Sequence, residues 1–568
     1  MKRLLKGGTV LNVFTGELDK QDLLIDGGKI VGVGDYCDAD ADVIEDISGK
    51  YVCPGFIDGH IHIESTMLTP TELAKICLPH GTTAIVADPH EIANVCGVKG
   101  ISYMLQASEG IPLNVYVNLP SCVPATPFDE SGAILHAEDL KPLYSHRRVL
   151  GLAEMMNYPG VLAEDEDVMN KISDALSLGR IVDGHAPLLC GKDLDKYISA
   201  GIQSDHECSN LDEAIEKIRK GQWVMIRQGT AARNLADLLP LFEAPYNHRC
   251  ILVTDDRHPA DLMNEGHIDN IVRLAAKWGK SPITAIRMAT IQAAQCFGLR
   301  YVGAVAPGYR ADLLVLNDLD SVDVRDVYSA GVKVVDNKKL ADIKTPTIDK
   351  ALCDTVLDSF HIEKLTQEDF YIEPKGDKCR VIGVIPGQIV TPERIEKIDW
   401  TANNGIDLQR DIIKLAVIER HNNTGHKGIG FISGIGLKRG AIASSVAHDS
   451  HNLIVIGTNE RDMAIAANRV CAVGGNVVVV DGEVVCEMKL PIAGLMTDRS
   501  VEKIAEENEA VRACVYELGV PENIEPFMNM AFVSLPVIPT LKMTTKGLFN
   551  VEKWSIVPLY IEGESDND

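Results

Sequence analysis

The chain has 568 residues, which exceeds one small fold at roughly 150 residues per domain. Hydrophobic residues make up 46% and charged residues 24% of the chain, a globular balance that excludes disordered and fibrous proteins. The 81 acidic residues outnumber the 55 basic ones and give a net charge of −26, so neither a nucleic acid polymer nor an anionic membrane is an expected partner.

Compartment is indicated by two further features. No stretch approaches the roughly 18 apolar residues of a membrane-spanning helix, and polar residues interrupt the N-terminus before a signal-peptide core can form. The 14 cysteines form no close-spaced framework and are expected to be reduced thiols. A cytoplasmic protein is therefore expected.

The first half of the chain predicts two kinds of structure. Residues 1–50 carry short apolar runs between glycines, typical of small β-strands and tight turns. From Tyr51 onward, β-rich runs alternate with amphipathic stretches of helical length, which indicates βαβ units. Eight strands are predicted, the first ending near 59–62 and the others at 83–87, 113–118, 149–153, 180–183, 201–204, 223–227 and 250–254. Eight repeats predict a (β/α)8 TIM-type barrel over residues 51–299.

The rest of the chain predicts two more domains. A helix is expected at 281–297, followed by short strands at 311–316 and 332–335. Because this texture matches the N-terminal segment, residues 1–50 and 300–345 are expected to form one composite β-sandwich domain. Residues 350–568 are expected to form a C-terminal α/β (α+β) domain, with charged helices at 407–420 and 498–518 and apolar strands at 453–456 and 476–480.

The sharpest local signal is Pro-Gly-Phe-Ile-Asp-Gly-His-Ile-His at residues 54–62. Side chains at alternate positions of a strand point to the same side, so His60 and His62 can bind one metal ion. A His-x-His pair alone is often structural. The Pro-Gly-x-x-Asp-Gly prefix, however, ends a strand sharply, as the C-terminal rim of a barrel requires.

Four more polar side chains follow predicted strands: Glu154, His185, His206 and Asp255. Each is weak evidence alone, because strand ends commonly carry polar residues. Together with the His pair they supply imidazoles and carboxylates in chain order at one rim. This set suits two divalent ions about 3.5–4 Å apart with a bridging hydroxide.

Further motifs carry a family resemblance. With His-Ile-His-Ile-Glu-Ser at 60–65, they are Ala-Asp-Pro-His-Glu-Ile-Ala-Asn at 87–94, Pro-Ser-Cys-Val-Pro-Ala at 120–125, Glu-Met-Met-Asn at 154–157, Asp-Gly-His-Ala-Pro at 183–187, Ser-Asp-His-Glu at 204–207, Thr-Asp-Asp-Arg-His-Pro at 254–259, and the runs at 435–441 and 447–452. The sequence resembles the adenine deaminase family of the amidohydrolase superfamily over nearly its whole length.

The resemblance implies a cytoplasmic, homodimeric hydrolase that converts adenine to hypoxanthine and ammonia in purine salvage. A metal-activated hydroxide would attack C6, with two divalent ions as cofactors, manganese being expected and iron or zinc being alternatives. Two other hypotheses remain open. One is another metal-dependent amidohydrolase that acts on an amide or cyclic amide. The other is a non-catalytic barrel homologue, which would typically have lost ligand residues that are all present here.

The resemblance also implies the ligand set. His60 and His62 would bind one ion, His185 and His206 the other, and Glu154 would lie near both, with Asp255 completing the set. Many amidohydrolases use a carboxylated lysine on the fourth strand, but residues 147–170 contain no lysine. Glu154 is therefore the expected anionic bridge, which argues against a dihydropyrimidinase-like, dihydroorotase-like or urease-like enzyme.

Deamination needs a base and an acid. Asp255 is the expected base that takes the proton of the nucleophile and passes it to the leaving amine, with Asp256 as the alternative. Attack on an aromatic ring also needs a ring nitrogen to be protonated. Either Glu154 or Glu91 is expected to do this, and the sequence does not choose between them.

Further residues carry two interpretations each. Asp88 and His90, with Glu91, would contact substrate or an additional metal, or would form a plain turn at Pro89. Arg227 would place a donor near the base, unless the following Gly-Thr simply begins a helix. Arg257, with its neighbour His258, is expected to orient the aspartates at 255 and 256. For the C-terminal cluster, a structural role is favoured over a metal site, a cover for the barrel or a dimer contact; its members are His421, His426, His448, Asp449 and His451.

Overall fold

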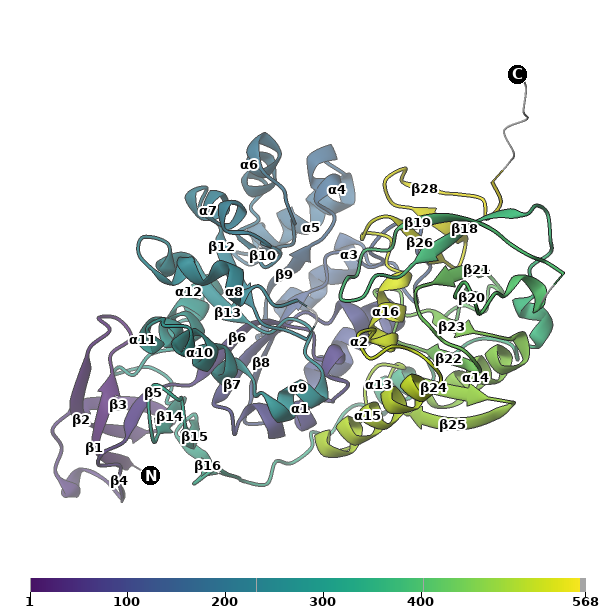
Figure 1. Ribbon diagram of the computed structural model, residues 1–568. Helices are drawn as coiled ribbons and strands as arrows, with labels where there is room; N and C mark the ends of the chain where they lie inside the picture. Colours follow the sequence, from purple (N-terminus) through teal and green to yellow (C-terminus); the bar gives the residue numbers. More distant parts are fainter. Residues whose placement is uncertain (1, 231, 402, 562–568) are drawn as a thin grey trace. The chain divides into compact units, whose positions relative to one another are not determined.

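The structure is a computed structural model that describes residues 2–230, 232–401 and 403–561. The chain divides into two compact units (Figure 1). The first unit comprises Met1–Pro89, Met104–Ser121 and His136–Ile348, and the second comprises His90–Tyr103, Cys122–Leu135 and Asp349–Asp568. Two short pieces of the expected barrel segment therefore group with the C-terminal region, a division that hydrophobic periodicity does not reveal.

Eight parallel strands form the centre of the first unit. They are β6 (Phe56–Ile61), β7 (Thr82–Ala87), β8 (Asn114–Leu119), β9 (Val149–Met155), β10 (Ile181–Gly184), β11 (Ser204–Asp205), β12 (Trp223–Arg227) and β13 (Cys250–Val253). They pair in chain order within two sheets, β6 to β10 and β11 to β13. The Asp255 N–H donates to the His60 carbonyl at 2.9 Å, and the Gln203 N–H donates to the Val182 carbonyl at 3.0 Å, so backbone bonds bridge both gaps. The strands thus follow one another around a TIM-type barrel, and all eight predicted strands are found.

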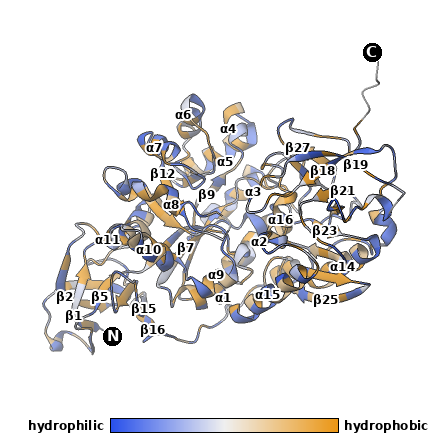
Figure 2. Cartoon of the chain, viewed as in Figure 1, coloured by the Kyte–Doolittle hydropathy of each residue, from blue (hydrophilic) through white to orange (hydrophobic). Residues whose placement is uncertain are grey.

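Helices follow the strands and cover the sheet. Those of the first unit are α1 (Pro70–Cys77), α3 (Ala137–Leu140), α4 (Tyr158–Ala163), α5 (Glu166–Ser177), α6 (Gly191–Ser199), α7 (Leu211–Arg219), α8 (Leu235–Leu238), α9 (Pro259–Asn264), α10 (Ile268–Lys277), α11 (Pro282–Arg287) and α12 (Ala293–Cys296). Helix α2 (His90–Ala107) crosses the boundary of the two units. Figure 2 shows hydrophobic strands inside the first unit and hydrophilic turns on α6 and α7. Strands such as β6 and β7 are buried along their whole length, which explains their continuous apolar runs.

Both flanks of the barrel segment contribute to one nine-stranded mixed sheet. Its strands are β1 (Arg3–Leu11), β2 (Leu18–Asp26), β3 (Lys29–Gly34), β4 (Val43–Asp46), β5 (Tyr51–Pro54), β14 (Leu313–Leu316), β15 (Val324–Ser329), β16 (Val332–Asp336) and β17 (Lys339–Leu340). The flanks meet where β5 pairs antiparallel with β14, from Tyr51 opposite Leu316 to Pro54 opposite Leu313. The expected side-by-side placement of the two flanks is therefore found.

The second unit is built on an eight-stranded sheet in the order β19-β18-β21-β20-β23-β22-β24-β25. These strands are β18 (Lys378–Gly383), β19 (Glu393–Lys397), β20 (Ile412–Ile418), β21 (Lys427–Ser433), β22 (Ala441–Ser444), β23 (Leu453–Gly457), β24 (Asn476–Val480) and β25 (Glu483–Met488). The predicted helix at 407–420 is wrong, because that segment contains β20. Its apolar run is rich in isoleucine and buried throughout in the middle of the sheet, and the charges flanking the run had suggested a helix.

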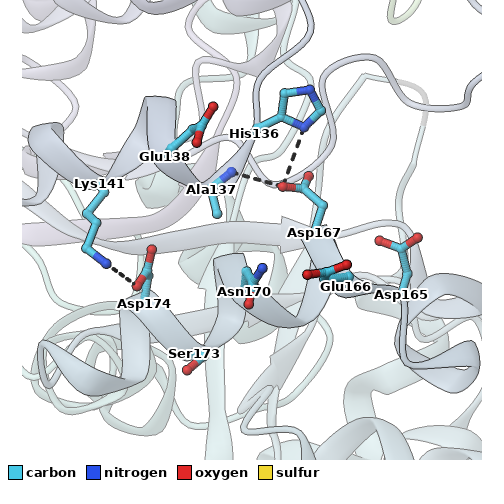
Figure 3. A pocket seen from close by; sticks show the side chains of 10 residues that line it. All are labelled: His136, Ala137, Glu138, Lys141, Asp165, Glu166, Asp167, Asn170, Ser173 and Asp174. Atoms are coloured by element: carbon cyan, nitrogen blue, oxygen red, sulfur yellow. Dashed lines mark hydrogen bonds and ion pairs between the residues drawn. The ribbon is translucent and has the colours of Figure 1, made fainter.

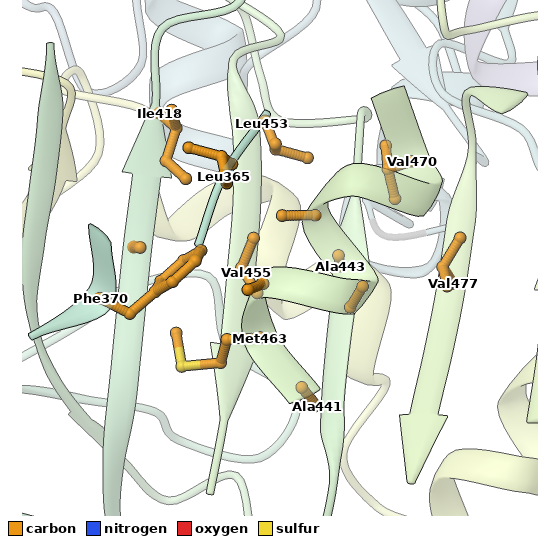
Figure 4. Packing of buried hydrophobic residues seen from close by; sticks show 14 of the residues in the cluster. Leu365, Phe370, Ile418, Ala441, Ala443, Leu453, Val455, Met463, Val470 and Val477 are labelled. Carbon is orange, nitrogen blue, oxygen red and sulfur yellow. The ribbon is translucent and has the colours of Figure 1, made fainter. Parts of the chain in front are cut away.

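Helices and a small sheet complete the second unit. They are α13 (Lys350–Leu357), α14 (Glu460–Val473), α15 (Val501–Glu517), α16 (Pro526–Val533), β26 (Leu541–Thr544), β27 (Gly547–Asn550) and β28 (Ser555–Ile556). Figure 4 shows Met463 of α14 packed beside Val455 of β23 and Phe370, all in one buried cluster. No helix within the described ranges is long and apolar enough to cross a membrane.

Candidate metal centre

Four histidines and two carboxylates converge where the barrel strands end. His60 lies in β6 and His62 directly after its end; Glu154 lies in β9, and Asp255 follows β13. His185 and His206 follow β10 and β11. The His60, His62, Glu154 and His206 residues are at most 4% exposed, and the Asp255 residue is 5% exposed. The structure therefore brings together all six residues that the sequence analysis selected as metal ligands.

Glu154 lies between the two pairs of histidines. Its Oε1 atom is 3.3 Å from His62 Nε2 and 3.8 Å from His60 Nε2. Its Oε2 atom is 2.6 Å from His185 Nδ1 and 3.2 Å from His206 Nε2. One carboxylate thus presents one oxygen to each histidine pair, which is the geometry of a bridging ligand.

The histidines of the first pair present ring nitrogens that suit a divalent cation. His62 Nδ1 donates to the Asp88 carbonyl at 3.1 Å, which leaves the Nε2 lone pair directed at the carboxylates. His60 Nε2 is buried and, among the residues that the structure describes, has no hydrogen-bond partner. Its nearest carboxylate oxygens, on Asp255 and Glu154, lie 3.6 and 3.8 Å away, beyond hydrogen-bond reach. Nitrogen and oxygen donors around such a gap fit a metal ion such as zinc, manganese or iron.

The electrostatics of the cluster favour positive charge. Burial opposes protonation of His60, but the carboxylates of Asp183 and Asp255 outweigh burial and raise the pKa of the imidazole to about 10. Burial is likewise outweighed at His185, where Glu207 and Glu154 raise the pKa to about 9. At Glu154, burial is outweighed by the neighbouring histidines, which hold the pKa of the carboxyl well below its usual range. Cations that replace these protons would bind at the same nitrogens.

Asp255 is oriented by an arginine. Its Oδ1 atom lies 3.2 Å from His62 Nε2, and its Oδ2 atom accepts from Arg227 at 2.7 Å. Arg227 also forms a bidentate ion pair with Glu207. The Asp255 backbone has a φ of 59°, in the left-handed region that aspartate tolerates only at a local penalty. Arg227 thus places a donor beside Asp255, as one of the two interpretations expected. The alternative was a helix that begins at the Gly-Thr after Arg227, but the next helix, α8, begins at Leu235.

The two residues after Asp255, Asp256 and Arg257, contact groups other than the histidines. Asp256 accepts from the Ser65 hydroxyl at 2.5 Å, so the geometry favours Asp255 over Asp256 as the group facing the histidines. Arg257 is fully buried and donates to the carbonyls of Gln228 at 2.9 Å and Gly266 at 3.1 Å. Within the described part of the chain, the Arg257 guanidinium bonds neither Asp255 nor Asp256, so it fixes the surrounding loops and does not hold these carboxylates directly.

Glu91 belongs to the second unit and is the second residue of α2, which begins at His90. Its carboxylate is 2.6 Å from His448 Nδ1 and also accepts from His451 Nε2. The Ala447 N–H donates to His451 Nδ1 at 3.2 Å, which places the proton of that ring on Nε2. A proton on Nε2 suits a hydrogen bond to the carboxylate and not metal ligation. Burial is outweighed by His448 and His451, which hold the pKa of Glu91 well below its usual range.

The other C-terminal histidines make structural contacts. His421 Nε2 is 2.7 Å from the Ser450 carbonyl, and burial holds the pKa of this imidazole well below its usual range. His426 Nδ1 is 2.7 Å from Glu130 within the same unit. His421 and His426 thus contact residues of their own unit, whereas His448 and His451 contact Glu91.

Three acidic residues at the site were not selected from the sequence. Glu207 lies 3.4 Å from His206 Nε2, and Asp183 Oδ2 lies 3.7 Å from His60 Nδ1. Asp58 accepts from the backbone N–H groups of His60 at 3.3 Å and Thr254 at 3.1 Å, which ties the ends of β6 and β13 together. All three stand next to, or two residues from, a selected histidine, and that adjacency was the available signal.

A separate surface pocket of about 680 Å³ lies on the first unit (Figure 3). Its lining is rich in acidic side chains, and the contacts drawn in it pair His136 with Asp167, Lys141 with Asp174, and the Ala137 N–H with Asp167. None of the metal-ligand candidates lines this pocket. It therefore forms no part of the centre described above.

Comparisons with known proteins define the class and then the family. Residues 51–334 match the amidohydrolase family, and residues 388–555 match the adenine deaminase C-terminal domain. The barrel segment is thus that of an amidohydrolase. The chain is 46% identical over 560 residues to adenine deaminase 2 of Carboxydothermus hydrogenoformans, covering 98% of this chain and 96% of that protein. It is 47% identical over 554 residues to adenine deaminase of Clostridium acetobutylicum, covering 96% of each. The chain belongs to the adenine deaminase family.

Proposed function

We propose that this protein hydrolyses adenine to hypoxanthine and ammonia at a centre for two divalent ions. The observation that carries the proposal is the position of Glu154, whose two oxygens face two separate pairs of histidines. The names of the relatives support adenine as the substrate. Manganese is the proposed metal, with iron or zinc as alternatives.

The ligands divide into two sets. His60 and His62 would hold one ion, His185 and His206 would hold the other, and Glu154 would touch both, with Asp255 completing the first set. When bound, such ions lower the pKa of water toward neutrality and so supply a hydroxide nucleophile at neutral pH. Arg227 holds the Oδ2 atom of Asp255, and the Oδ1 atom stays directed at His62.

The proton balance assigns roles to the carboxylates. The attacking water carries two protons, and the products need one on a ring nitrogen and one on the departing ammonia. Asp255 and Glu154 both have a pKa well below the usual range, so each begins as a carboxylate able to accept a proton. Asp255 is the proposed carrier to the leaving amine. The carrier to the ring nitrogen is Glu154 or Glu91, and the low pKa of Glu91 means that it too would first have to receive a proton.

The competing function is hydrolysis of an amide or cyclic amide by the same kind of centre. Adenine loss followed by ultraviolet absorbance, with hypoxanthine and ammonia measured as products, separates the two. The proposal predicts turnover of adenine by manganese-loaded protein and no turnover of a dihydrouracil and N-acetyl amino acid panel. Turnover of that panel without turnover of adenine would reverse the assignment.

Several finer proposals accompany this function. The flanks at 1–50 and 300–345 are proposed to form a β-sandwich domain, 51–299 the catalytic barrel and 350–568 a C-terminal domain. The protein is proposed to act in the cytoplasm as a homodimer. All 14 cysteines are free thiols, which supports a reducing compartment.

A further inference from the structure

Lys217 of α7 is a lysine with no exposed surface. Its ammonium group forms ion pairs with Asp205 and with Glu213, the latter at 2.7 Å. It also donates to the Ala186 carbonyl at 2.8 Å. A lysine ammonium has three protons, and three acceptors surround this one. Burial opposes the charge, but Asp205 outweighs it and keeps the pKa of Lys217 above its usual range.

Two of these acceptors adjoin metal-ligand candidates. Ala186 directly follows His185, and Asp205 directly precedes His206. The other carboxylate oxygen of Asp205 accepts the Glu207 N–H at 2.7 Å, which closes the turn around His206. One ammonium group therefore joins the two backbone segments that carry His185 and His206.

Glu213 extends the same network. Its Oε1 atom accepts the Leu188 N–H at 2.8 Å, and its Oε2 atom accepts the Ser209 N–H at 3.3 Å. Leu188 lies three residues after His185, and Ser209 lies three residues after His206. The carboxylate thus anchors the continuation of both segments, while Lys217 anchors their beginnings.

We propose that Lys217 is a positioning residue that sets the affinity of the ion held by His185 and His206. The inference rests on the proposed two-ion centre. Hydrogen bonds behind metal ligands typically change metal affinity about 10–100-fold when they are removed. Loss of the ammonium also leaves Asp205 and Glu213 as buried carboxylates without their counter-ion, which favours displacement of both segments.

The effect is expected to be selective. The first histidine pair is anchored by different groups, since Asp58 accepts the His60 N–H and the Asp88 carbonyl accepts from His62 Nδ1. Lys217 makes none of those contacts. Its removal should therefore weaken one ion of the pair and spare the other, a result that general loss of stability would not produce.

Lys414 of β20 provides a matched control in the second unit. It is also without exposed surface, pairs with Glu460 and donates to the Phe370 carbonyl at 2.9 Å. Lys414→Met removes the same group from a similar environment that adjoins no ligand of the proposed centre. Any change common to Lys414→Met and Lys217→Met reflects the loss of a buried lysine and not the positioning of ligands.

The test is a manganese titration of metal-stripped full-length protein, followed by elemental analysis and by the electron paramagnetic resonance signal of a spin-coupled manganese pair. In Lys217→Met, the dissociation constant of one ion should rise about 10–100-fold, with loss of the coupled signal, as in His206→Ala. The other ion should keep its wild-type constant, and Lys414→Met should bind both ions as the wild type does. If Lys217→Met is insoluble, Glu213→Gln should give the same selective change with smaller magnitude.

Wild-type binding of both ions by Lys217→Met and Glu213→Gln would overturn the inference, as would equal weakening of both ions. These outcomes differ from failure of the proposed function. The proposed function fails if manganese-loaded wild-type protein forms no hypoxanthine and ammonia when it is given adenine.

Discussion

Removal of the Arg227 side chain tests how the site holds its base. Arg227 is mostly buried and neutralises two carboxylates, those of Glu207 and Asp255. The side chains of this trio are 12%, 16% and 7% exposed, so solvent screens the charges little. Arg227→Met should destabilise the metal-free protein by about 3–5 kcal/mol at neutral pH, the usual penalty for removing one partner of a buried ion pair. This corresponds to a fall in melting temperature on the order of 5–10 °C.

The pH dependence follows from the direction of the pKa shifts. Burial is outweighed at Asp255 by His60, His62 and Arg227, which hold the pKa well below its usual range; the pKa of Glu207 is lowered too. Folded-state pKa values below the unfolded ones stabilise the wild type at pH values above the unfolded pKa, and this stabilisation is lost as the pH falls through the folded pKa. In Arg227→Met, the pKa of Glu207 should rise most, because Arg227 is the main group that offsets its burial, whereas Asp255 keeps His60 and His62. Protonation of Glu207 at lower pH then removes a buried charge that has lost its partner. The stability gap between variant and wild type should therefore narrow from about pH 7.5 to about pH 5.

Thermal melting in chelator at both pH values measures this gap. Arg257→Met is the control, because Arg257 is buried even more completely than Arg227 but bonds backbone carbonyls and the partly exposed Glu265. That variant should lose stability without a comparable narrowing. The reasoning is refuted if Arg227→Met melts within about 1 °C of the wild type. It is also refuted if the stability difference between Arg227→Met and the wild type narrows with falling pH no more than that of Arg257→Met does.

Three further outcomes are expected. His60→Ala should abolish deaminase activity and weaken binding of the first ion, measured by manganese titration, whereas a variant of the exposed His426 should bind as the wild type does. Glu154→Gln keeps the shape of the bridge and removes its charge, so activity should fall at least about 100-fold and metal affinity about 10–100-fold, and unchanged affinity would exclude a bridging role. Metal at about 100 times its dissociation constant should stabilise the wild-type protein by about 2.7 kcal/mol in thermal melting, and no stabilisation should remain in His60→Ala for that ion.

The barrel and its rim could be predicted because their signals are local. Each strand buried on both faces reads as a continuous apolar run, and polar residues directly after such runs fall at one rim by the geometry of a parallel barrel. His60, Glu154 and Asp255 were found in this way. The strand β11 has only two residues, Ser204 and Asp205, and the predicted strand at 201–204 overlaps it at one residue.

Other features depend on contacts between distant segments. The charged flanks of residues 407–420 predict a helix, whereas the surrounding sheet buries the isoleucine-rich run there as strand β20. The ion pair of Arg227 with Glu207 joins residues 20 positions apart, and no periodicity reports it. Lys217 resembles any lysine of an amphipathic helix in the sequence, and only the placement of Asp205 and Ala186 around it reveals its burial.

The central claim is that adenine deamination depends on two ions held around Glu154. The most direct measurement titrates metal-stripped wild-type protein with manganese while hypoxanthine formation from adenine is recorded at each addition. The account predicts no product without metal and a rate that rises until about two equivalents are bound and then stays level. A full rate in metal-free protein, or no product in protein that holds two ions, would contradict it.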